Sequence, residues 1–312
     1  YVTLPDIRGR EQILTVHMRK VPLGQDVSAN IIARGTPGMS GADLANLCNE
    51  AALMAARRSA RVVEMQDFEK AKDKILMGPE RKSMVMPEEE RRNTAYHESG
   101  HALIGKLLPK CDPVHKVTII PRGRALGMAM FMPTKDSFGS SKTWLTRFIC
   151  TAMAGRVGER VITGDISSGA SQDIKQATRM ARQMVCDWGM SDLGPISYNE
   201  NTDTVFLGRE ISRTQGHSDE TARRIDVAVA QIVNEQFAMA EKIIAEHGEA
   251  HRKIAEALLE HETLDGIHIM EILKTGAIQT PVVGSPVANP VREANPAGPA
   301  PETGTQSSPS PA

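Results

Sequence analysis

The sequence predicts a mainly α-helical protein, with a small helical unit, then a larger, mostly helical unit that carries one short β-hairpin. Apolar residues recur at intervals of three and four through most of the chain, which is the period of an amphipathic helix. Two neighbouring runs, VHKVTIIP and GMAMFMP, are β-like instead and are joined by a turn that contains Gly123. The stretch GPERKSMVMP, residues 78–87, is interpreted as a linker between the two helical units.

The first unit covers residues 1–77. A short strand-like run at residues 1–4 is followed by an expected helix over residues 6–21. Ser40 has the properties of an N-cap, and Asp43, three residues later, can complete a capping box for the next helix. The segment VVEMQDFEKAKDKILMG then predicts a short strand-like entry and a further helix.

The larger unit covers residues 88–275. Its expected helices cover residues 88–108, 142–162, 171–188 and 218–262, the last range with a break near Gly248. The second of these is apolar on most sides, as expected for a buried helix. Residues 276–312 form a tail that should be disordered, because eight of the chain's 18 prolines occur from Pro281 onward among Ser, Ala, Gly and Thr.

The overall composition narrows the class of protein. There are 37 basic and 38 acidic residues, a net charge of −1, so nothing predicts nucleic acid as a partner. The four cysteines are widely spaced, which favours reduced thiols over a disulfide framework. No apolar run approaches the roughly 18 to 20 residues that span a bilayer. Because the chain begins at Tyr1 in strand-like sequence, we expect it to be a fragment of a longer protein.

The stretch TAYHESGHALIGKLL, residues 94–108, contains the candidate metal site. His97 and His101 are four residues apart, so on a helix they share one face, with Cβ atoms about 5–6 Å apart, and can bind one ion. Neutral imidazole nitrogens suit zinc. Glu98 follows the first histidine and can take a proton from a metal-activated water without occupying a ligand position.

The motif H-E-x-x-H is not unique to metal sites, since it occurs by chance in about one of fifty such sequences. The alternative interpretation is a pair of surface histidines on an amphipathic helix. The stretch HGEAH, residues 247–251, repeats the histidine spacing but lacks the glutamate, and Gly248 weakens a helix there. We interpret this second stretch as a solvated helix face.

A catalytic zinc usually has three protein ligands, so a third ligand must come from another segment. Asp173 is the main candidate, because it lies on the apolar side of its helix, where a carboxylate needs a partner. The row on that side is Asp173, Ala177, Met180, Met184 and Trp188. The helix dipole alone also explains a carboxylate in the first turn. Two competitors remain: Glu159 can orient a histidine from outside the ligand set, and Asp165 is explained as a turn residue.

Together these motifs resemble the FtsH family of membrane-anchored, ATP-dependent zinc metalloproteases. The resemblance covers about residues 1–275 and rests on the segments LPDIRGREQIL, SGADLANLCNEAAL, TAYHESGHALIG, VHKVTIIPRGRALG, SSGASQDI and SDETARRID. It implies that Asp173 joins His97 and His101 as ligands of one Zn²⁺ per chain, with Glu98 as the catalytic base. Ser99 departs from the family, in which Ala is common at that position.

The resemblance also assigns the parts of the chain. Residues 1–77 look like the end of an AAA+ ATPase module with its helical lid, and residues 88–275 look like a zincin-like, M41-type peptidase domain. The chain contains no G-x-x-x-x-G-K-[ST], so ATP and Mg²⁺ are expected only in a missing part of the ATPase module. By resemblance, the whole protein is a homohexamer that acts on unfolded protein substrates. Segments missing from this chain would hold it in the bacterial inner membrane, with the protease domain on the cytoplasmic side.

Several alternatives stay open at this point. The hairpin can offer an edge strand to an extended substrate, or it can be ordinary core β-structure. The helices at residues 218–262 are expected to provide packing and hexamer contacts. One alternative function is a non-catalytic scaffold that forms a hexamer, and the intact set His97, Glu98, His101 and Asp173 argues against it. Another is a stand-alone, ATP-independent peptidase, and the lid-like residues 1–77 argue against that.

Overall fold

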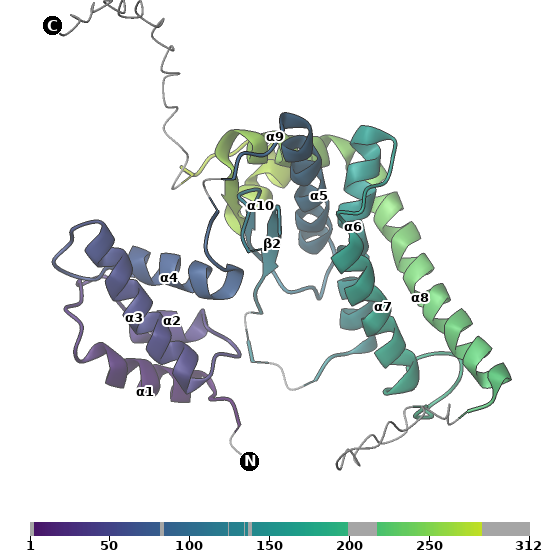
Figure 1. Ribbon diagram of the computed structural model, residues 1–312, viewed down its shortest axis with the longest axis horizontal. Helices are drawn as coiled ribbons and strands as arrows, with labels where there is room; N and C mark the ends of the chain where they lie inside the picture. The colour runs from purple at the N-terminus through teal and green to yellow at the C-terminus, as the bar shows by residue number, and fades with distance from the viewer. Residues whose placement is uncertain are drawn as a thin grey trace, which may run out of the picture.

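The computed structural model describes residues 3–81, 84–123, 125–133, 135–136, 139–198 and 217–282. Within these residues the protein is mainly α-helical with one small antiparallel sheet, so the predicted fold class is confirmed (Figure 1). The strand expected at residues 1–4 is not present at Thr3 and Leu4, which have no regular structure. The tail predicted to be disordered begins at residue 276, but Glu271 accepts hydrogen bonds from the backbone N–H groups of Gln279 and Thr280. From residue 283 onward the predicted tail lies outside the described part of the chain.

The first unit is a group of four helices with its own apolar core (Figure 1). These helices are α1 (Ile7–Met18), α2 (Ala29–Arg34), α3 (Gly41–Arg57) and α4 (Met65–Met77). Helix α3 begins with the predicted capping box, because Ser40 and Asp43 each accept a hydrogen bond from the other's backbone N–H. The sequence did not predict α2, which has only six residues and therefore little periodic signal.

In its described residues, the second unit contains six helices and the sheet. Its elements are α5 (Glu88–Leu107), β1 (Val114–Thr118), β2 (Met128–Phe131), α6 (Lys142–Thr163), α7 (Ser171–Cys186), α8 (Asp219–Glu246), α9 (Gly248–His261), β3 (Thr263–Asp265) and α10 (Gly266–Thr275). The predicted hairpin is formed by β1 and β2, and β3 pairs with the other side of β1 in the order β2-β1-β3. Among the described helices, none combines the length and the apolar character needed to cross a membrane.

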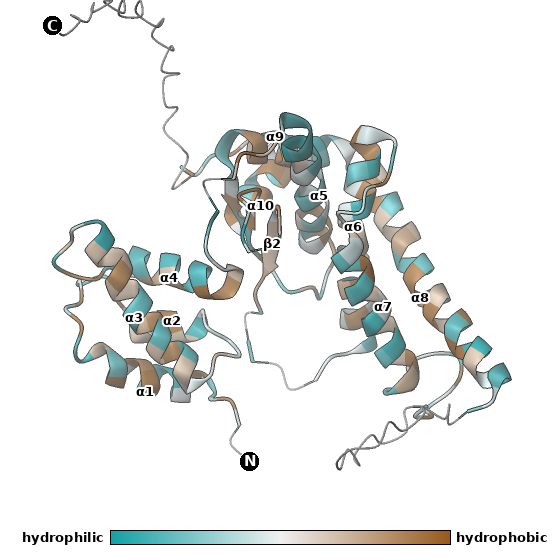
Figure 2. Ribbon diagram, viewed as in Figure 1, coloured by the Kyte–Doolittle hydropathy of each residue, from teal (hydrophilic) through white to brown (hydrophobic). Residues whose placement is uncertain are grey.

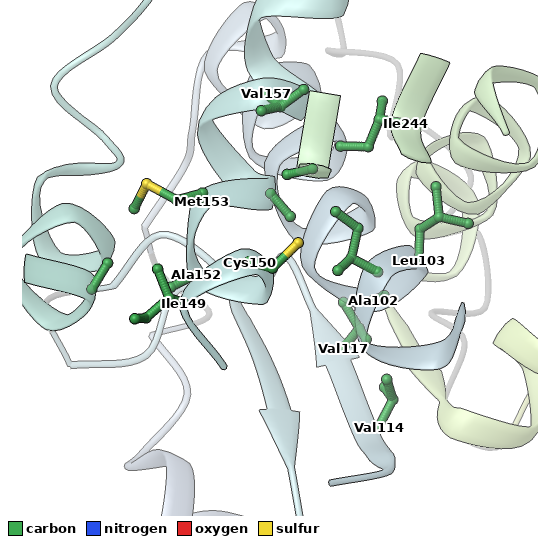
Figure 3. Packing of buried hydrophobic residues seen from close by; sticks show 14 of the residues in the cluster. Ala102, Leu103, Val114, Val117, Ile149, Cys150, Ala152, Met153, Val157 and Ile244 are labelled. Carbon is green, nitrogen blue, oxygen red and sulfur yellow. The ribbon is translucent and has the colours of Figure 1, made fainter. Parts of the chain in front are cut away.

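The core of the second unit holds α5 between α6, α9 and the sheet. Figure 3 labels side chains of this core that lie near one another, among them Leu103 of α5, Val117 of β1, Cys150 of α6 and Ile244 of α8. Each of these side chains is at most 1% exposed, and burying an apolar side chain of this size contributes about 1.5–3 kcal/mol. Helices α7 and α8 cover the outer side of α6 and carry hydrophilic residues toward solvent (Figure 2).

Helices α5 and α6 cross at unusually short range because glycines lie at the crossing. A Cβ atom at Gly100 of α5 would lie 2.5 Å from the carbonyl oxygen of Ala154 on α6. A Cβ atom at Gly155 of α6 would lie 2.5 Å from His97 Nε2. The absence of side chains at these two positions therefore brings the backbone of α6 directly against the histidines of α5.

Candidate metal centre

Helix α5 brings the two histidines of the H-E-x-x-H motif together. His97 and His101 lie one turn apart, and their rings meet edge to face with centroids 4.7 Å apart. Their Nε2 atoms are 3.0 Å from each other. Both rings are largely buried, with 12% and 9% of the side chain exposed, because α6 covers this face of α5.

Asp173, in the first turn of α7, completes the cluster. Its Oδ2 atom lies 3.2 Å from Nε2 of His97 and 3.6 Å from Nε2 of His101. Ligand atoms on a tetrahedral zinc with bonds of about 2.0–2.1 Å are separated by about 3.3 Å. The three atoms therefore have the mutual spacing that one such ion requires, and the structure brings together all three residues of the predicted ligand set.

The hydrogen bonds behind the rings fix which nitrogen of each histidine faces the cluster. His97 Nδ1 is 2.7 Å from Glu159 Oε1, and His101 Nδ1 is 2.7 Å from the carbonyl oxygen of Thr151. A carbonyl and an ionised carboxylate can only accept, so both Nδ1 atoms carry hydrogen in the neutral rings. The two Nε2 atoms then point lone pairs at each other, and such an arrangement requires a cation between them.

Acidic side chains give the centre a strongly negative environment. Burial alone would lower the pKa of His97, but hydrogen bonds to Asp173 and Glu159 outweigh it and raise that pKa to about 10. Burial works against the ionised form of Asp173 as well, yet hydrogen bonds to His101 and His97 hold its pKa well below the usual range. Protons and a metal cation are therefore expected to compete for the nitrogen of His97.

Glu98 lies beside the cluster without joining it. Its side chain is buried, and burial is the main cause that raises the pKa of its carboxyl group. The backbone N–H of Ala129 in β2 donates to this carboxylate, and a Cβ atom at Gly127 would lie 2.8 Å from Glu98 Oε1. The start of β2 therefore packs directly against the proposed base.

The structure places Glu159 and Asp165, the two other candidates for the third ligand, outside the cluster of His97, His101 and Asp173. Glu159 orients His97 from outside the ligand set, as one of the sequence interpretations stated. Asp165 lies exposed in the turn after α6, where its Oδ1 accepts the N–H of Ile166. The backbone carbonyl of Thr151, which accepts from His101 Nδ1, could not be predicted from the sequence, because every residue type has such a carbonyl. Sequence reasoning also missed Gly155, although a glycine inside an apolar helix does indicate a close approach.

The interpretation of residues 247–251 as a solvated face is wrong for His251. This side chain is 1% exposed, its Nε2 lies 2.9 Å from the carbonyl oxygen of Tyr96, and burial lowers its pKa. The reason is that α9 packs against α5 and turns His251 into that interface, whereas His247 is exposed. The apolar row of α7 also ends earlier than expected, since Trp188 is 45% exposed.

A mainly helical fold with an H-E-x-x-H helix, an aspartate within reach of both histidines and a buried glutamate beside them is typical of a metallopeptidase. The chain belongs to peptidase family M41, whose family model matches residues 84–272. A model of the AAA+ lid domain matches residues 26–70. The resemblance to the FtsH family is confirmed by these matches together with the relatives described next.

Three curated relatives carry similar names. The chain is 51% identical to "ATP-dependent zinc metalloprotease FtsH 2" of Methylacidiphilum infernorum, over 92% of this chain and 45% of the relative. It is 52% identical to "ATP-dependent zinc metalloprotease FtsH" of Photobacterium profundum, over 87% of this chain and 40% of the relative. The protein of the same name from Magnetococcus marinus is 53% identical, over 86% and 40%. The chain thus spans less than half the length of these relatives.

Proposed function

We propose that this chain is the zinc-dependent endopeptidase part of an ATP-dependent protease. His97, His101 and Asp173 hold the ion, and Glu98 is the general base. The observation that carries this proposal is the convergence of Nε2, Nε2 and Oδ2 from α5 and α7, with separations of 3.0, 3.2 and 3.6 Å. Nitrogen and carboxylate ligands in this number are typical of catalytic zinc.

When bound, zinc polarises the carbonyl of a peptide bond and makes water acidic enough to lose a proton near neutral pH. Glu98 accepts that proton on a carboxylate oxygen and returns it to the nitrogen of the leaving amine. Burial suits Glu98 for both steps, because a raised pKa lets the carboxyl group hold the proton between them. Glu159 and the carbonyl of Thr151 keep the two rings in the orientation that the ligands need.

We propose that the substrate binds as an extended chain along β2. This strand is at the edge of the described sheet, all four of its residues are half-buried, and its beginning touches Glu98. Main-chain pairing with an edge strand gives affinity with little sequence preference. Such pairing suits unfolded proteins as substrates, and it favours the edge-strand interpretation of the hairpin over ordinary core β-structure.

For the whole protein we propose the organisation that the relatives' names and the lid match support. Residues 1–77 are the end of an AAA+ module and its lid, residues 78–87 a linker, residues 88–275 the peptidase domain and residues 276–312 a C-terminal tail. ATP and Mg²⁺ bind outside these 312 residues. The assembly is a homohexamer held in the bacterial inner membrane, with the peptidase domain on the cytoplasmic side.

The test is Glu98→Gln, which keeps the size of the side chain and removes the base. Cleavage of casein should fall by about two to four orders of magnitude, while zinc content stays near one ion per chain. Cleavage at the wild-type rate by this variant would refute the assignment of the base. The alternative of a non-catalytic scaffold predicts that the wild-type chain shows no chelator-sensitive cleavage of casein or of short peptides.

A further inference from the structure

Glu159 has a second partner besides His97. Its Oε1 atom faces His97 Nδ1 at 2.7 Å, and its Oε2 atom accepts a hydrogen bond from the hydroxyl of Ser167 at 2.6 Å. The backbone N–H of Ser167 also bonds to this carboxylate. Glu159 is only 5% exposed, so both of its oxygens are fixed by protein groups, and the carboxylate cannot rotate without losing one of these bonds.

Ser167 belongs to the segment that connects α6 to α7. Every residue from Thr163 to Gly169 is exposed, and Ser167 turns its hydroxyl inward to Glu159. The same hydroxyl accepts the N–H of Gly169 at 3.0 Å. A Cβ atom at Gly169 would lie 3.0 Å from this hydroxyl and 3.1 Å from Glu159 Oε1, so the glycine leaves room for the contact.

This contact lies directly before the ligand helix. Ala170, next after Gly169, is fully buried and is the N-cap of α7, and Asp173 follows in the first turn. The segment is thus tied to α6 by the hydrogen bonds of Ser167 and ends at the buried side chain of Ala170. The position of Asp173 depends on where α7 begins, and therefore on this segment.

We propose that Ser167 is a positioning residue of the metal centre. Its hydroxyl links two parts of the site: the carboxylate that orients His97 and the segment that places Asp173. It thereby fixes the relative positions of two ligands that come from different helices. This inference rests on the proposed function. Loss of the hydroxyl leaves Glu159 Oε2 without that donor and releases the segment before α7, so both ligands become less well placed for one ion.

The test compares zinc binding by Ser167→Ala, Ser167→Thr and Ser168→Ala in the full 312-residue chain. Zinc affinity is measured by competition with a chromophoric chelator, and the visible absorption of the Co²⁺-loaded protein reports the ligand geometry. Ser168 is the matched control, because it is exposed in the same segment and uses its backbone carbonyl to accept the N–H of Ser171, which alanine preserves. Thermal unfolding of the metal-free variants checks that the fold is retained.

Ser167→Ala should bind zinc about tenfold or more weakly and should alter the Co²⁺ spectrum. Ser167→Thr, which keeps a hydroxyl, and Ser168→Ala should both stay within about twofold of the wild type. Wild-type affinity and an unchanged spectrum in Ser167→Ala would overturn the inference while leaving the proposed function intact. If the wild-type chain itself bound no zinc, the proposed function would fail first.

Discussion

At the scale of single residues, the two histidines of the centre differ in the group that accepts the hydrogen bond from Nδ1. His97 is backed by the carboxylate of Glu159, whereas His101 is backed by the neutral carbonyl of Thr151. A carboxylate behind an imidazole makes the ring a stronger electron donor than a carbonyl does. We therefore expect the charge of Glu159 to contribute to metal affinity, in addition to the orientation of the ring.

Replacing Glu159 by Gln tests that contribution of charge. The amide oxygen can still accept from His97, but the negative charge is gone and an NH2 group replaces the oxygen that accepts from Ser167, so zinc affinity should fall about tenfold to a hundredfold. Chelator competition measures the change. Asp165→Asn is the control, because this carboxylate lies in the adjacent turn, is exposed and does not touch a ligand. An equal loss in both variants would indicate a general electrostatic effect instead of a role for Glu159.

How far the site could be predicted from sequence depends on how local each relation is. The pair His97 and His101 follows from the helical period alone, and the structure has them on one face of α5. The residues alone left Asp173 open, because its distance to α5 depends on how α6 and α7 pack, and only the resemblance to the FtsH family assigned it as a ligand. His251 was misjudged for the same reason, since its burial comes from α9 packing against α5. Contacts between distant elements leave no local pattern.

At the scale of elements, the crossing of α5 and α6 determines the shape of the centre. Glycines at positions 155 and 158 lie on the side of α6 that faces α5, but they meet different atoms. A Cβ atom at Gly155 would lie 2.5 Å from His97 Nε2 and 2.6 Å from His101 Nε2. A Cβ atom at Gly158 would lie 2.3 Å from the carbonyl oxygen of Tyr96. One glycine thus makes room for the ligands and the other for the backbone.

Alanine at these two positions should separate metal binding from stability. Gly155→Ala pushes a methyl group against both ring nitrogens, so zinc affinity should fall at least tenfold, with a smaller loss of stability. Gly158→Ala meets rigid backbone and should lower the free energy of unfolding by about 1–3 kcal/mol. Chelator competition and denaturant unfolding of the metal-free proteins measure the two effects. Equal zinc affinity in Gly155→Ala and wild type would contradict this account of the crossing.

The elements themselves were predictable where they are long. Helices α5, α6 and α8 each present many turns of apolar periodicity, and their expected limits agree closely with those in the structure. Sequence reasoning missed three short elements, α2, β3 and α10, which have six, three and ten residues. Strand β3 owes its conformation to pairing with β1, which is about 145 residues earlier in the chain, and not to its own composition.

At the scale of the whole molecule, polar contacts join the lid-like unit to the peptidase unit. Asp73 of α4 pairs with Lys116 of β1, and its Oδ1 lies 3.5 Å from His115 Nε2. Arg122, after β1, donates at 3.0 Å to the carbonyl of Gly78, the first residue of the linker that follows α4. Strand β1 pairs directly with β2, the strand that we propose binds substrate. The first unit therefore contacts the same sheet that lies beside the catalytic centre.

The ion pair of Asp73 and Lys116 has a predictable dependence on pH. Burial alone would raise the pKa of Asp73, but His115 and Lys116 outweigh it and hold that pKa below 3.8. Burial alone would lower the pKa of Lys116, but Asp73 outweighs it and raises that pKa above 10.5. The pair therefore contributes its full stabilisation between about pH 4 and about pH 10. The contribution is lost as the pH falls through the depressed pKa of Asp73 or rises through the raised pKa of Lys116.

Asp73→Asn removes the acidic partner and leaves the ammonium of Lys116 largely buried, which should cost about 3 kcal/mol. The amide of Arg81, which donates to the carbonyl oxygen of Pro121 at 2.8 Å, reports on the contact between the units. At pH 7 hydrogen exchange of this amide should be at least tenfold faster in the variant, and the difference should shrink below about pH 4 as Asp73 of the wild type becomes protonated.

Asp265→Asn is the control, because this carboxylate is 3.7 Å from Lys116 and 45% exposed, so its loss should cost less than about 1 kcal/mol. An unchanged exchange rate in Asp73→Asn at pH 7 would mean that the ion pair does not hold the two units together.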